Sequence, residues 1–174
     1  MDTEPTTPQS SAERIMHEAG VIAQNIKDKP MKLVDVYTSD EERPPKVTPA
    51  AIVSIIQGTL EIPDENVLEL DLSSASQVEK AWQSLRQVDQ DKLFVFKYPD
   101  NLDKLNSDIG LGSDILDLYL RIQANYFTSE KTPANYTIIQ FYGDSLIRAL
   151  SKRKQGQRIT KAGSVPKIEL NPIT

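Results

Sequence analysis

The feature of this sequence that most constrains its fold is a regular alternation of strand and helix patterns between residues 31 and 98. Strands are predicted at 31–38 (MKLVDVYT), 66–72 (NVLELDL) and 92–98 (KLFVFKY). Helices are predicted between them, one capped by Thr48 with Pro49 in its first turn and one opened by a Ser76–Glu79 capping box. This order predicts an α/β fold: a small single-domain three-layer structure whose parallel sheet has flanking helices.

The second predicted strand leaves a competing architecture open. Its leucines alternate with Glu69 and Asp71, which predicts one buried face and one solvated face. A parallel strand that is covered on both faces is almost wholly apolar. An α+β fold with an open sheet face is therefore the alternative.

Outside this central region, three further helices are predicted from apolar spacing. The first runs from Ser11 to Asp28 behind a Ser10–Glu13 capping box, and the second runs from a capping Ser113 to Phe127. The third begins at Thr132-Pro133 and reaches Leu150, although its segment YTIIQFY also fits a strand.

The domain organisation follows from composition and length. Residues 1–10 are expected to form a disordered leader, residues 11–150 a globular α/β domain, and residues 151–174 a basic, largely flexible tail with a short strand at 167–170. The absence of cysteine excludes disulfide scaffolds and thiolate zinc sites. No signal peptide and no apolar run of about 20 residues occur, so a soluble, cytoplasmic protein without membrane contact is expected.

Charge is distributed unevenly along the chain. Residues 151–174 carry six basic side chains against one acid, Glu169, whereas the first 150 residues hold fourteen basic and twenty-four acidic side chains. The formal net charge of −5 therefore hides an acidic body joined to a cationic end. Clustered lysine and arginine favour an anionic partner, and the candidate contact residues are Lys152, Arg153, Lys154, Arg158 and Lys161.

Few residues point to catalysis. His17 is the one histidine, and its position on the first predicted helix is typical of a surface residue. Asp35, Glu69 and Asp71 lie on predicted strands and could hold Mg²⁺ if they met at a strand end. Gly110 and Gly112 precede a predicted helix start, where backbone N–H groups can bind an anion, but Asp114 already places a negative charge there.

These patterns favour a non-catalytic binding or assembly protein without a cofactor. Its acidic body would dock a protein partner, while the basic tail would contact nucleic acid or another anionic surface. One alternative is a Mg²⁺-dependent α/β enzyme acting on a phosphorylated ligand through Asp35, Glu69 and Asp71. A second alternative is a structural subunit of a larger complex, which would expose an apolar patch. The oligomeric state does not follow from the sequence.

Overall fold

The computed structural model describes six stretches of the chain: residues 11–39, 44–87, 91–102, 110–128, 135–153 and 165–171. Their elements are α1 (Ser11–Ile26), β1 (Met31–Thr38), α2 (Pro49–Thr59), the short 3₁₀ helix η1 (Asp64–Asn66), β2 (Val67–Asp71), α3 (Ala75–Arg86), β3 (Lys92–Lys97), α5 (Leu111–Phe127), β4 (Tyr136–Gly143), α6 (Asp144–Arg153) and β5 (Lys167–Glu169).

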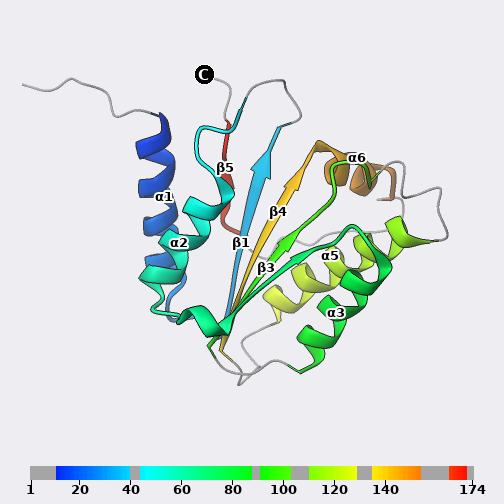
Figure 1. Cartoon of the computed structure of the whole chain (residues 1–174), viewed down its shortest axis with the longest axis horizontal. Coiled ribbons are helices and arrows are strands. Elements are labelled where there is room, and N and C mark those ends of the chain that lie inside the picture. Colours follow the sequence, from blue (N-terminus) through cyan, green and yellow to red (C-terminus); the bar gives the residue numbers. More distant parts are fainter. Residues whose placement is uncertain are drawn as a thin grey trace, which may run out of the picture.

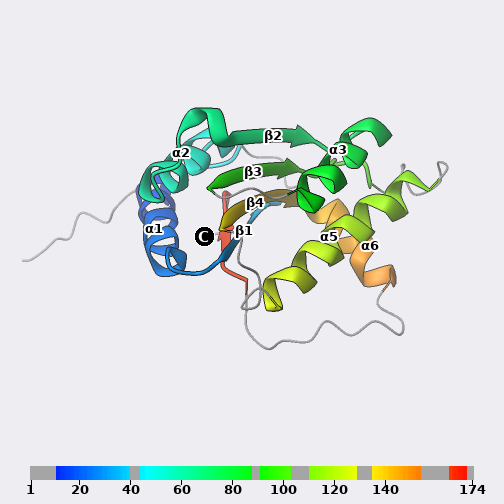
Figure 2. The same cartoon turned by 90° about the horizontal axis from the view of Figure 1, so that it is seen from below.

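The strands form one parallel sheet in the order β2-β3-β4-β1-β5 (Figure 1). Helices α1 and α2 lie on one side of this sheet, and α3 and α5 lie on the other, with α6 at the end of β4 (Figures 1 and 2). The predicted three-layer α/β fold is confirmed. The alternation of polarity in β2, which favoured an open sheet face, has a local cause: β2 is an outer strand, and Glu69 and Asp71 are exposed there.

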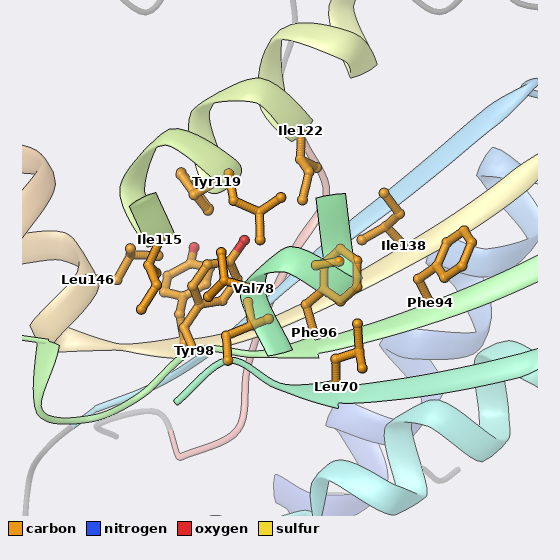
Figure 3. Packing of buried hydrophobic residues seen from close by; sticks show 14 of the residues in the cluster. Leu70, Val78, Phe94, Phe96, Tyr98, Ile115, Tyr119, Ile122, Ile138 and Leu146 are labelled. Carbon is orange, nitrogen blue, oxygen red and sulfur yellow. The ribbon is translucent and has the colours of Figure 1, made fainter. Parts of the chain in front are cut away.

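Each face of the sheet buries its own hydrophobic cluster. The cluster beneath α1 and α2 contains Val34 and Val36 of β1, and the cluster beneath α3, α5 and α6 contains Leu33 of the same strand. Side chains that alternate along a strand point to opposite faces, which explains this division. The second cluster is shown in Figure 3, where Phe96 and Ile138 of the sheet face Ile122 of α5.

One helix start lies where it is predicted, and two differ. Thr48 caps α2 as expected, and its hydroxyl accepts a hydrogen bond from the backbone N–H of Ala51 at 3.2 Å. The cap of α3 is Ser74 rather than Ser76, because Ser74 has the extended backbone that a cap requires and accepts from Gln77. Helix α5 begins after Gly110, two residues before the predicted cap Ser113, since the φ of 81° at Gly110 suits a glycine.

The helix predicted for residues 132–150 is wrong over residues 136–143, which form the strand β4. All eight residues of β4 are buried, between β1 on one side and β3 on the other. Burial on both faces and hydrogen bonding on both edges outweigh the helical spacing of the segment. The strand alternative is confirmed. Helix α6 follows at once from Asp144, whereas the proposed start at Thr132-Pro133 lies outside the described residues.

The described parts of the C-terminal region belong to two elements of the domain. Helix α6 continues to Arg153, and the short strand predicted near residues 167–170 is present as β5, which pairs with β1. The predicted leader, residues 1–10, lies outside the described residues. Among the described helices, none has the length and apolar character needed to cross a membrane.

Candidate functional site

The carboxyl ends of β1 and β4 form the natural candidate site of this topology. The two strands are neighbours, but the chain leaves β1 toward α2 on one face and leaves β4 into α6 on the other. In open α/β sheets, ligands bind in the crevice outside the strand ends at such a switch point. Polar side chains gather beside this switch point on the face covered by α5.

Asp35 of β1 is the centre of a buried polar network beside this switch point. Asp35 is 4% exposed, and its carboxylate accepts three hydrogen bonds. The amide of Gln140 donates at 3.0 Å, the hydroxyl of Tyr119 at 3.2 Å and the amide of Gln123 at 3.3 Å. The hydroxyl of Tyr98 in turn donates to the amide oxygen of Gln140. Each oxygen of the carboxylate is thus occupied by a donor of the chain itself.

Burial governs the acid–base behaviour of this network. Desolvation raises the pKa of Asp35 to about 6, while the hydrogen bonds from Gln140, Tyr119 and Gln123 and the positive charge of Lys167 act in the opposite direction. Burial also raises the pKa of the Tyr98 and Tyr119 hydroxyls, which both lie close to the Asp35 charge. The tyrosines are therefore protonated donors at neutral pH.

Tyr37 extends the site toward the strand ends. Its hydroxyl donates a hydrogen bond to Asp144, the first residue of α6, and this bond is the main reason that the pKa of Tyr37 is raised to about 12. The ring centroid of Tyr37 lies 6.0 Å from that of Tyr142 on β4. The Lys167 ammonium group of β5 lies 5.3 Å from the same Tyr37 centroid, within cation–π range.

This arrangement is suited to holding secondary structure together rather than to binding phosphate. A phosphate cradle after a strand uses glycine-rich backbone and a lysine. The chain from Ser39 to Thr48 contains no glycine, and its three acids, Asp40, Glu41 and Glu42, outnumber Arg43 and Lys46. The neighbouring carboxylates Asp35 and Asp144 add negative charge, which would repel an anionic ligand.

The three acids proposed to hold Mg²⁺ do not meet. Asp35 lies on β1 and points to the face covered by α5, whereas Glu69 and Asp71 lie on β2, with β3 and β4 between the two strands. Glu69 and Asp71 point to the opposite face, because they alternate with the core residue Leu70. Glu69 instead approaches the ammonium group of Lys97, at 3.8 Å. Within the described ranges, no group of three acidic or histidine side chains could hold a metal ion. The Mg²⁺ hypothesis for this triad is wrong.

The predicted cationic contact residues are described only in part. Lys152 is exposed on α6, and Arg153 is the last residue of that helix. Lys154, Arg158 and Lys161 lie outside the described residues. The stretch that carries them joins α6 to β5, so a folded element of the domain stands on each side of it.

Other residues singled out from sequence take structural positions. His17 is exposed on α1 and borders a cleft of about 400 Å³ between α1 and the end of α2. Gly110 caps α5, and Gly112 is buried in the first turn of that helix, where Asp114 provides the favourable negative charge. Among the described residues, the large hydrophobic side chains that are exposed are Val21 of α1 and Ile147 of α6, which do not share a face of the sheet.

Sequence reasoning missed the partners of Asp35. Gln140 lies in the middle of a segment whose residues are otherwise apolar or aromatic, and a polar residue buried in such a strand requires a partner. Gln123 follows Tyr119 by four residues on the same stripe of a helix, so both face one neighbour. These signals indicate a buried polar network, but they do not identify Asp35 as its centre.

No family model matches the chain, and no curated protein matches it. Among solved structures, the chain is similar to the crystal structure of Saccharomyces cerevisiae RIF2, with a TM-score of 0.38 and 15% sequence identity. The match covers 98% of this chain and 66% of that chain.

Proposed function

We propose that this chain is a non-catalytic binding protein whose acidic body docks a protein partner and whose cationic residues contact the phosphates of nucleic acid. The contact residues would be Lys152, Arg153, Lys154, Arg158 and Lys161. The observation that carries the proposal is this run of positive charge, which contains no acid, in a protein of net charge −5. Such a run lowers its electrostatic free energy by binding a polyanion and releasing counterions.

The anchoring of both flanking elements supports the proposal. Leu146 and Ala149 of α6 are buried in one core cluster, and Ile168 of β5 is buried in the other. The backbone N–H of Leu170 donates to the carbonyl of Tyr37 at 3.0 Å. The described elements on the two sides of the cationic stretch are therefore part of one folded body.

The chemistry of the candidate site also favours binding over catalysis. A general base must reach a substrate proton. The Asp35 carboxylate is buried and already accepts hydrogen bonds from Gln140, Tyr119 and Gln123. The site is better explained as a structural support for β1, β4 and α5.

The test replaces Lys152, Arg153, Lys154, Arg158 and Lys161 together by glutamine. Fluorescence anisotropy with labelled duplex DNA and with single-stranded RNA would be measured across a salt series. The unaltered protein is expected to bind with an affinity that falls by roughly four decades per decade of salt, as about five phosphate contacts require. The substituted protein is expected to lose this binding and its salt dependence.

A matched control removes five cations elsewhere on the exposed surface: Arg14, Lys27, Lys29, Arg86 and Arg121. It changes the net charge by the same amount, so retained binding would assign the effect to position rather than to total charge. If both variants lose binding equally, or if the unaltered protein binds neither nucleic acid, the nucleic-acid part of the proposal is wrong.

A further inference from the structure

A second region of the molecule has the composition of a small-molecule site. A cleft of about 400 Å³ lies between the amino ends of β2 and β3 and the second half of α3. Its size falls in the range of about 300–1,000 Å³ that is typical of ligand pockets. The cleft is separate from the switch point, because it lies at the opposite end of the strands.

The floor of the cleft is apolar and packed against the core. It includes Leu68, which is half-buried, and Phe94, which is 4% exposed and is labelled in Figure 3. The Phe94 ring stacks on Phe96 with centroids 6.1 Å apart and meets the edge of Tyr136 at 6.4 Å. A flat apolar group placed on this floor would gain burial without first ordering the floor.

The walls of the cleft carry two lysines. Lys80 of α3 and Lys92 of β3 line the cleft, and neither forms an ion pair with any residue in the described stretches. The cations outside the cleft on the same two elements are paired: Arg86 of α3 with Glu79 at 3.2 Å, and Lys97 of β3 with Glu69 at 3.8 Å. Within the described parts of α3 and β3, the two lysines without an ion pair are therefore the two that line the cleft.

Polar side chains complete the lining. Gln87, the residue after α3, can donate from its amide, and the one acid among the described residues that border the cleft, Glu65, is outnumbered by the two lysines. A ligand that matches this lining has a flat apolar body and one anionic group. We infer that the cleft binds a small amphipathic anion of the aryl carboxylate or aryl sulfonate type, with its ring on Leu68 and Phe94 and its charge between Lys80 and Lys92.

The test uses anilinonaphthalene sulfonate, an aryl sulfonate whose fluorescence rises in apolar surroundings. Trp82 is the single tryptophan and lies on α3, so energy transfer from its indole reports dye that is bound to this protein, and the cleft variant assigns the place. The unaltered full-length chain is expected to bind the dye with saturable energy transfer. The Lys80→Gln/Lys92→Gln variant is expected to bind about tenfold more weakly, because two charge-assisted contacts are lost.

The control is the Arg86→Gln/Lys97→Gln variant, which removes the same charge from the same two elements outside the cleft. It is expected to bind the dye like the unaltered chain, while phenylnaphthylamine, which lacks the sulfonate, should not distinguish the two variants. Circular dichroism would establish that both variants fold. Equal dye affinity in the cleft variant and the unaltered chain, or an equal loss in both variants, would overturn the inference. Loss of the energy-transfer signal when the five cations of residues 152–161 are replaced would also overturn the inference, because it would show that the dye binds at those residues and not in the cleft.

Discussion

The hydroxyl of Tyr37, near the carboxyl end of β1, donates a hydrogen bond to the carboxylate of Asp144, the residue at which α6 begins. The same tyrosine ring lies beneath the ammonium group of Lys167, the first residue of β5. One side chain of a central strand therefore contacts both elements that flank the cationic stretch. The positions of α6 and β5 relative to the sheet depend in part on this residue.

Replacing Tyr37 by phenylalanine keeps the ring and removes the hydrogen bond to Asp144. The free energy of unfolding is expected to fall by about 1 kcal/mol, the usual net value of a hydrogen bond. Replacement by leucine also removes the aromatic face below Lys167, which is expected to cost about 0.5–1 kcal/mol more. Urea unfolding of the three proteins measures both steps, and equal stability of all three would contradict the proposed role of Tyr37.

The buried carboxyl of Asp35 predicts a pH-dependent stability. Its pKa is raised from 3.8 to about 6 on folding, so the unfolded chain ionises at a lower pH than the folded chain. The favourable contribution is complete below pH 3.8, is lost as the pH rises toward 6, and is absent above that value. The loss amounts to about 3 kcal/mol. Urea unfolding between roughly pH 3 and pH 8, a span that brackets this window, measures the decline.

The Asp35→Asn variant is the control for this pH dependence. An asparagine cannot ionise. Its NH₂ group would meet the donating amide of Gln123, and rotation of that amide would present its oxygen as the acceptor. The variant is expected to be more stable than the unaltered protein at pH 7 and to lack the decline between pH 4.5 and 6. The same decline in both proteins would show that another group causes it.

Gln140→Leu tests the network from its other side. The leucine has a similar volume but leaves the Asp35 carboxylate and the Tyr98 hydroxyl without this partner in the core. The free energy of unfolding is expected to fall by about 2–3 kcal/mol. Because the hydrogen bond from Gln140 lowers the pKa of Asp35, its loss should also move the pH window of stability upward. Gln24→Leu on the exposed surface of α1 is the matched control and should change neither quantity.

The order of the first elements could be predicted because each depends on local signals. Thr48 and Pro49 start α2 in any context that accepts a helix, and the runs at 31–38 and 92–98 contain the β-branched and aromatic residues of buried strands. Residues 136–143 also contain β-branched and aromatic residues, but their apolar spacing fits a helix as well, so local signals do not decide between the two. Their conformation depends on β1 and β3, which lie far away in sequence and close both edges of the strand.

The candidate site depends still more on distant contacts. Asp35 and Gln140 are opposite each other in the pairing of β1 with β4 and are separated by 105 residues in the chain. Periodicity predicts which face of a strand is buried, but not which strand lies beside it. The sequence pattern therefore predicts Asp35, Glu69 and Asp71 as one set of metal ligands, although the sheet order places them apart.

Glu61 offers a test of backbone strain at the turn between α2 and η1. Its φ is 58°, in the left-handed region that costs a side chain with a Cβ about 1–2 kcal/mol. Its N–H donates to the carbonyl of Gly58 at 3.2 Å, so the turn is held in this conformation. Glu61→Gly is expected to raise the free energy of unfolding by up to about 1 kcal/mol, since relief of strain exceeds the entropy that glycine adds to the unfolded chain. Glu61→Ala removes the same carboxylate but keeps the strain, so a gain of equal size in that variant would assign the effect to charge instead.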